Sequence, residues 1–114
     1  MNLFDELIGE QLSAVTFVQD YFQLWFDGPG INVNNPTIVY HSGIKNQSWN
    51  NGFRDAVCGQ ISKIVESVLV RKEDSVKIVF NHQSYISISL KPDDYDSPEA
   101  IFAHGFENEK WIVL

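Results

Sequence analysis

Apolar and polar positions alternate along several short segments of this chain. In residues 21–26 every second residue is Phe or Leu, and the segments 76–80 and 85–90 repeat the pattern with Val, Ile, Phe and Leu. Successive side chains of a strand point to opposite faces, so each segment is predicted to be a strand with one face in the core. The predicted core residues are Phe4, Leu7, Leu24, Phe26, Val57, Ile78, Phe80, Ile86 and Ile88.

Two other stretches favour short helices. Residues 3–8 place their apolar side chains on one side at helical spacing, and Gly9 is suited to end that helix. Residues 53–59 are predicted to form the second helix. A turn is predicted at 27–30, where Asp, Gly and Pro cluster. Further strands are predicted at 11–19, 31–34, 37–40, 61–71 and 111–114.

The chain also repeats itself. Residues 4–15 are matched by residues 53–64 at an offset of 49, with Phe, Gln and Ser identical and apolar positions aligned. Residues 20–26 are then matched by residues 74–80 at an offset of 54. The offset between matched residues thus increases along the chain, as expected when loops lengthen and the strands and helices are kept. The pattern therefore predicts two related structural units.

The predicted fold class is α+β. One domain, 1–114, contains two αβββ pseudo-repeats that share one core, because each half alone is too small to be stable. Pseudo-repeat 1 covers about 3–40 and pseudo-repeat 2 about 53–92, and their antiparallel meanders are predicted to form one sheet or a half-open barrel. The polar segment 41–52 is predicted to be a linker loop. A C-terminal extension, 93–114, completes the fold.

The C-terminal extension contains a helix-start pattern. Ser97 is suited to be the N-cap, Pro98 suits the first helical position, and Glu99 lies in the first turn. We therefore expect a short helical turn through Ile101 and Phe102, followed by the terminal strand. A strand that begins at Ile101 is the alternative.

The composition limits the partners that the protein can bind. Eight Lys and Arg against 15 Asp and Glu give a formal net charge of −7. Binding to nucleic acid or to an anionic membrane relies on Lys and Arg that neutralise phosphates, so we expect neither partner. The charge suits a basic protein partner, although acidity also serves solubility alone.

Cysteine content and the N-terminal sequence bear on the compartment. Cys58 is the only cysteine, so no disulfide can form within the chain, and a reducing compartment is expected. Asp5 and Glu6 stand where a signal peptide would be basic, and no apolar run approaches the roughly 18 residues of a membrane-spanning helix. The sequence therefore predicts a cytoplasmic protein.

The titratable residues form no recognisable catalytic or metal-binding pattern. His41, His82 and His104 fall in predicted turns or loops, without the i, i+4 helical spacing of zinc ligands. Cys58 has no base nearby in the sequence and is expected to be a buried apolar thiol. We therefore expect no catalytic residues, no metal and no cofactor.

An acidic loop follows the second repeat. Asp93, Asp94 and Asp96 cluster with Glu99 in this loop. Oxygen-rich loops bind calcium, but this segment lacks the central Gly of an EF-hand loop and contains Pro98. Acidic side chains also stabilise a helix N-terminus through its dipole, and this is the interpretation that we prefer.

Several aromatic side chains cannot all belong to the core. Tyr21 and Trp25 lie on the face of their strand opposite its apolar residues, and Tyr85 does so in its own strand. Tyr and Trp on an outer sheet face are typical of a binding hot spot or a homodimer surface, unless helices or the 41–52 loop cover them. The predicted partner-binding residues are Tyr21, Trp25, Tyr85, Trp49, Asp93, Asp94 and Asp96.

Four short motifs carry a resemblance to known proteins. They are Leu7-Ile-Gly-x-x-Leu12, Asp20-Tyr-x-x-Leu-x-Phe-Asp-Gly28, Pro98-Glu-Ala100 and Lys110-Trp-Ile-Val113. The pattern resembles a group of small uncharacterised bacterial proteins, some of which are regarded as immunity proteins of polymorphic toxin systems. The resemblance implies a bacterial cytoplasmic protein that neutralises a partner by binding, and it brings no catalytic residues.

Taken together, the residues favour a non-catalytic protein-binding module that is immunity-like. This hypothesis depends on the outward-facing aromatic side chains and on the lack of a catalytic constellation. One alternative is a small-ligand-binding protein or an enzyme with a pocket between the repeats. Another is a homodimer formed through the outer sheet face.

Overall fold

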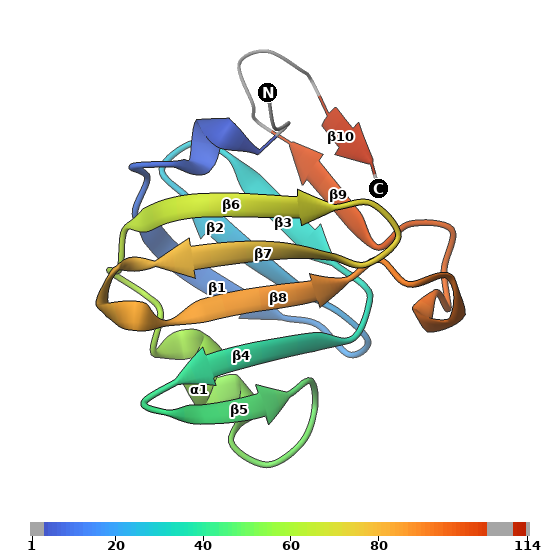
Figure 1. Cartoon of the computed structure of the whole chain (residues 1–114), viewed down its shortest axis with the longest axis horizontal. Helices are drawn as coiled ribbons and strands as arrows, with labels where there is room; N and C mark the ends of the chain where they lie inside the picture. Colours follow the sequence, from blue (N-terminus) through green and yellow to red (C-terminus); the bar gives the residue numbers. More distant parts are fainter. Residues whose placement is uncertain (1–3, 105–110, 114) are drawn as a thin grey trace.

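The chain folds into two antiparallel sheets of five strands each, which pack face to face (Figure 1). The computed structural model describes residues 4–104 and the backbone of residues 111–113. In Figure 1 the strands of sheet 2 lie in front, and those of sheet 1 pass behind them at an angle. Sheet 1 has the strand order β1 (Leu12–Phe17), β2 (Phe22–Phe26), β3 (Gly30–Val33), β9 (Ile101–His104) and β10 (Trp111–Val113). Sheet 2 has the order β5 (Ile44–Gln47), β4 (Thr37–His41), β8 (Tyr85–Ser89), β7 (Ser75–Phe80) and β6 (Val65–Arg71).

Helical structure is limited to short pieces. Among the described residues the single α-helix is α1 (Phe53–Cys58), which packs against β1, β4 and β5. The other helical pieces there are the 3₁₀ turns η1 (Asp5–Leu7), η2 (Asn81–Gln83) and η3 (Pro92–Asp94). The predicted α+β class is therefore wrong, because the fold is mostly β. Helices of one or two turns close few hydrogen bonds, so they depend on the sheets against which they pack.

The prediction of one sheet or a half-open barrel is also wrong, because the two halves exchange strands. After β3 the chain passes Pro36 and crosses from sheet 1 to sheet 2, where Thr37 of β4 pairs with Ile88. After β8 it crosses back to sheet 1, where Ile101 of β9 pairs with Val33. Each sheet thus has three strands from one half and two from the other. Proline lacks the N–H that would continue a ladder, which suits Pro36 to the first crossing.

A pseudo-twofold axis relates the two halves. Gln11 and Ile64, which are 53 positions apart, form an isolated antiparallel bridge between the starts of β1 and β6. The hydrogen bonds that flank this bridge occur in pairs related by the same offset. Gly9 N donates to Val65 O as Ser62 N donates to Leu12 O, and Leu12 N donates to Lys63 O as Val65 N donates to Glu10 O. The two halves are therefore related by symmetry in space, with the axis through this bridge. The offset here is 53 rather than the 49 of the sequence match, so Gln11 is not the structural counterpart of Gln60.

The core between the sheets confirms the argument from alternation. All nine predicted core residues are buried, together with Phe22 and Phe53, whose rings meet edge to face with centroids 5.5 Å apart. Full burial of a Phe, Leu or Ile side chain contributes roughly 1.5–3 kcal/mol, so this interior is the main source of stability. The nine are Phe4, Leu7, Leu24, Phe26, Val57, Ile78, Phe80, Ile86 and Ile88.

The linker loop predicted at 41–52 is wrong in part. Within it β5 pairs with β4 in a hairpin, which is closed by Ser42 and Gly43 with φ values of 52° and 80°. A two-residue turn with positive φ at both positions matches the twist of the flanking strands. The alternation pattern misses β5 because its side chains are mostly exposed, so no apolar face marks it.

The helical turn predicted after Ser97 is wrong as well. The Ser97 hydroxyl donates to Glu99 O instead of capping a helix, and β9 follows. Ile101 and Ala103 are buried while β9 pairs with β3, and this burial outweighs a local helix-start pattern. The terminal strand is confirmed as β10, whereas Leu114 of that prediction lies outside the described residues.

Candidate functional site

The outer face of sheet 2 is hollowed by two adjoining pockets, which we call the sheet-2 groove. The larger pocket, of about 500 Å³, is its polar end, and the smaller, of about 290 Å³, is its basic end. Ile38, Ser75 and Ser87 line both pockets, so the two form one continuous depression. These side chains alternate along their strands with buried core residues, which explains why they face outward.

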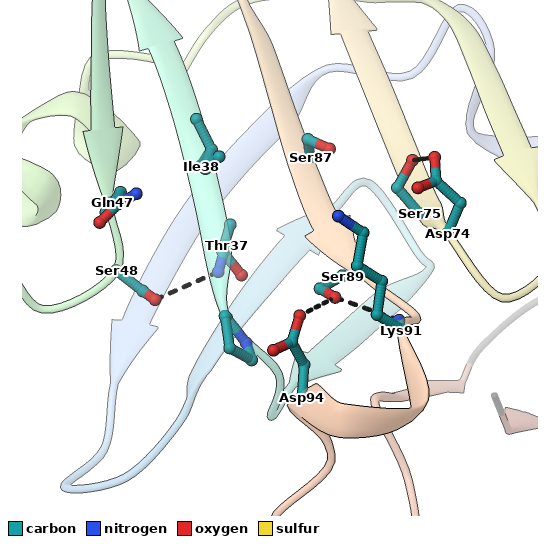
Figure 2. A pocket seen from close by; sticks show the side chains of 11 residues that line it. Thr37, Ile38, Gln47, Ser48, Asp74, Ser75, Ser87, Ser89, Lys91 and Asp94 are labelled. Atoms are coloured by element: carbon teal, nitrogen blue, oxygen red, sulfur yellow. Dashed lines mark hydrogen bonds between the residues drawn. The ribbon is translucent and has the colours of Figure 1, made fainter.

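The polar end is a set of fixed hydroxyl and carboxylate groups (Figure 2). The Ser89 hydroxyl donates to Asp94 Oδ2 at 2.5 Å and accepts a bond from Lys91 N at 3.1 Å. Ser48 Oγ accepts a hydrogen bond from Thr37 N at 3.1 Å. The Ser89 hydroxyl is therefore oriented by its bond to Asp94, and the Ser48 oxygen is positioned by the bond from Thr37 N, before any ligand arrives.

The turn η3 places Asp94 beside the last residue of β8. Lys91 and Pro92 lead into this turn, and Asp94 N donates to Lys91 O at 2.9 Å. The Lys91 side chain extends back over β8 toward Ser87 in Figure 2. One cation and one carboxylate therefore come from the same short turn to this end of the groove.

The basic end carries three cations, Lys45, Arg71 and Lys77. None of its lining residues is acidic, and none of the three cations forms an ion pair within the described part of the chain. Lys77 Nζ lies 4.0 Å from the centroid of the Tyr85 ring. That ring is stacked on Tyr40, with centroids 5.3 Å apart and planes inclined by 10°. A cation over an aromatic face is attracted to it, so Lys77 is held in place by the stacked pair.

The charge of the groove differs from the charge of the whole protein. The sequence has eight Lys and Arg, and four of these line the groove. Its two lining carboxylates, Asp74 and Asp94, both belong to the polar end and both accept bonds from serine hydroxyl groups. The acidic surplus of the chain therefore lies mainly elsewhere. The four cations are Lys45, Arg71, Lys77 and Lys91.

The structure divides the predicted partner-binding residues among separate places. Tyr85 and Asp94 lie in the sheet-2 groove, at its basic and polar ends. Trp49 and Asp96 line another pocket of about 440 Å³. Asp93 is exposed and lines neither pocket of the groove. Tyr21 and Trp25 belong to the sheet-1 side of the molecule and are half-buried.

Trp25 packs tightly on the outer face of sheet 1. Its Nε1 donates to Thr16 Oγ1 at 3.3 Å, and its ring lies edge-on to His104 with centroids 5.1 Å apart. Both rings close over Gly30, where an added Cβ would lie 2.6 Å from His104 Cε1 and 2.7 Å from Trp25 Cζ3. The neighbouring strands thus partly cover Trp25.

Trp49 covers one end of the core. Its ring meets those of Phe22 and Phe53 at centroid distances of 6.2 Å and 5.6 Å, and the Arg54 guanidinium lies 5.5 Å from the ring centroid. Since 42% of Trp49 is exposed, the side chain combines a packing role with an accessible surface. Its contacts account for its position without a ligand.

Three other titratable residues, His41, Cys58 and Lys63, do not line the groove. His41 Nδ1 lies 3.1 Å from Gln60 Nε2, and Cys58 is exposed, so the prediction of a buried thiol is wrong. Burial lowers the pKa of the Lys63 ammonium, whose Nζ donates to Ser84 Oγ at 3.1 Å. Within the described residues no three His, Cys, Asp or Glu side chains come close enough to hold a metal ion.

Comparisons with known proteins do not assign the chain to a family. No protein-family model, curated protein or solved structure matches the chain. The resemblance to bacterial immunity proteins therefore stays a prediction. None of the described helices combines the length and apolar character needed to span a membrane.

The aromatic and acidic clusters of the sequence do not identify most of the groove residues. The available signal was the composition of the outward positions in strands already predicted by alternation. Ser75 and Lys77 occupy those positions in β7, and Ser87 and Ser89 occupy them in β8. In a chain with a net charge of −7, outward positions that carry Lys and Ser but no acid indicate a specialised face.

Proposed function

We propose that the protein is a non-catalytic binding module that holds a protein partner in the sheet-2 groove. The observation that carries this proposal is the groove itself, which runs over strands β4 to β8 as two joined hollows. Its wall combines hydroxyl groups, the Tyr85 ring and charged side chains. Interfaces between proteins use the same mixture of aromatic anchors and polar groups.

The chemistry of the groove supports binding rather than reaction. A serine nucleophile needs an adjacent base, usually a histidine, that is itself oriented by a third group. Among the described lining residues of the groove there is no histidine. Ser75 and Ser89 donate instead to the carboxylates of Asp74 and Asp94.

The immunity-like role belongs to this proposal. A protein that neutralises its target by binding needs a preformed surface and no chemistry of its own. The fixed side chains of the groove are compatible with that requirement, since a rigid surface loses little entropy on binding. The outer aromatic residue that takes part is Tyr85, while Trp25 is partly covered on the opposite sheet.

Blocking the groove is the direct test of the proposal. Ser87 lines both hollows, so Ser87→Trp fills the groove from its centre. Val18→Trp, at an exposed position just after β1, is the matched control. Tagged wild-type protein and both variants are incubated with bacterial lysate, and the retained proteins are identified by mass spectrometry.

We expect the wild type and Val18→Trp to retain the same protein in stoichiometric amount and Ser87→Trp to lose it. Equal retention by Ser87→Trp, with circular dichroism that shows all three proteins folded, contradicts the proposal. Elution of the wild type as a dimer that only Ser87→Trp disrupts assigns the groove to self-association instead.

A further inference from the structure

The charge of the basic end indicates which chemical groups it would bind. Lys45, Arg71 and Lys77 line a hollow of about 290 Å³ that has no acidic lining residue among those described. We propose that this end binds the carboxylates of an acidic segment of the protein partner. This inference rests on the proposed function and names the chemistry of the partner surface.

The overall acidity of the chain does not oppose such a partner. Charges act over a Debye length of roughly 8 Å at physiological salt, so a ligand in the hollow responds mainly to the groups that line it. The nearest lining carboxylates, Asp74 and Asp94, belong to the polar end and already accept serine hydroxyl groups. Over the whole groove four cations stand against two carboxylates, so its lining is net positive although the protein carries a net charge of −7.

The cations are partly prepared for a carboxylate before it arrives. Lys77 lies over the Tyr85 ring, and Tyr85 is stacked on Tyr40, which restricts where the ammonium group can be. The Arg71 guanidinium can bond both oxygens of one carboxylate. Positioned cations lose less side-chain entropy on binding than free ones, so they add to affinity.

The second hollow favours a peptide segment over a small anion. The groove continues from the cations past Ser75 and Ser87 to the carboxylates of the polar end. Hydroxyl groups in the middle suit the backbone of a bound segment, and Asp74 and Asp94 suit a basic or N–H group at its other end. The distribution of charge along the groove thus fixes the direction in which a segment lies.

The test uses a fluorescein-labelled hexaglutamate peptide and a hexalysine peptide of equal length. Binding to the full-length protein is measured by fluorescence anisotropy for the wild type and for Lys45→Gln, Arg71→Gln and Lys77→Gln. Lys72→Gln removes the same charge next to Arg71, from a residue that lines neither hollow, and serves as the control. We expect each groove variant to weaken hexaglutamate binding about threefold to tenfold and the control to leave it unchanged.

Three results overturn the inference. One is an equal loss in Lys72→Gln, which would show only an effect of net charge. Another is tighter binding of hexalysine than of hexaglutamate. The third is displacement of the peptide by inorganic phosphate at equal concentration, which would make the basic end a small-anion site.

The two proposals fail in different ways. One possible result is that Ser87→Trp abolishes retention of a partner, whereas Lys45→Gln, Arg71→Gln and Lys77→Gln still retain it. The groove then binds a protein through contacts other than these cations. In that case the proposed function is supported, and the proposal that the basic end binds an acidic segment is contradicted. If Ser87→Trp retains the partner as well, the groove is not the binding surface.

Discussion

At the scale of single residues, the outer face of sheet 1 shows how one absent side chain shapes a surface. Gly30 faces Trp25 across the β2–β3 ladder, and the rings of Trp25 and His104 occupy the space where a Cβ would stand. The sequence pattern places Trp25 correctly on the outer face, but it does not show that a glycine on the next strand leaves the space that the ring occupies. The pairing of Trp25 with Gly30 depends on the register of β2 and β3, which is set by the turn between these strands.

We therefore expect Gly30→Ala to destabilise the fold by about 1–3 kcal/mol, because the new Cβ forces both rings to move. The measurement is urea unfolding of the wild type and the variant. In a Trp25→Ala background the same substitution should cost clearly less, since one of the two rings is gone. An equal cost in both backgrounds would assign the effect to the backbone rather than to the rings.

At the scale of elements, the sequence predicts the strands with a buried face and misses those without one. Alternation identifies β2, β7 and β8, and their inward residues are buried as expected. The edge strand β5 has exposed Ile44 and Lys45 and no apolar face, so period-two reasoning has no signal there. β9 follows a good helix-start pattern, and its pairing with β3 and β10, together with the burial of Ile101 and Ala103, selects the strand. The same limit applies to the groove, whose members come from five different strands and from several of the segments that connect them.

The β4–β5 turn offers a direct test of backbone conformation. Gly43 has a φ of 80°, and we expect Gly43→Ala to lower the unfolding free energy by about 1–2 kcal/mol because alanine is strained there. Ser42 has a φ of 52°, and Ser42→Asn should raise stability by a few tenths of a kcal/mol, since asparagine adopts this conformation more readily. Both changes are measured by urea unfolding. A neutral Gly43→Ala would show that the turn adopts another form in solution.

At the scale of the whole molecule, exchange of strands ties the two halves together. Sheet 1 needs β9 and β10 from the second half, and sheet 2 needs β4 and β5 from the first. The internal repeat could be detected in the sequence, but no local pattern states to which sheet a strand goes. That choice depends on burial of both sheets at once, which is a property of the complete chain.

This exchange predicts the behaviour of a divided chain. Fragments 1–50 and 51–114 separate the halves at an exposed turn, and we expect each alone to be unfolded by circular dichroism. Mixed together they should elute as one complex with the spectrum of the intact protein. A single fragment that folds by itself would show that strand exchange is not required for stability.

The pseudo-twofold axis at the Gln11–Ile64 bridge also has an evolutionary meaning. A gene for one half, before duplication, would have encoded a homodimer with two identical outer faces, each able to evolve the same site. In the present chain Lys77 and Ser87 correspond to Gln23 and Asn32 on the other sheet, at offsets of 54 and 55. After the two copies are fused in one chain, a substitution on one outer face no longer changes the other. In the proposed function the sheet-2 face is the one that serves recognition, while the matching positions of sheet 1 carry a hydrogen bond from Gln23 Nε2 to Asn32 Oδ1 at 3.0 Å.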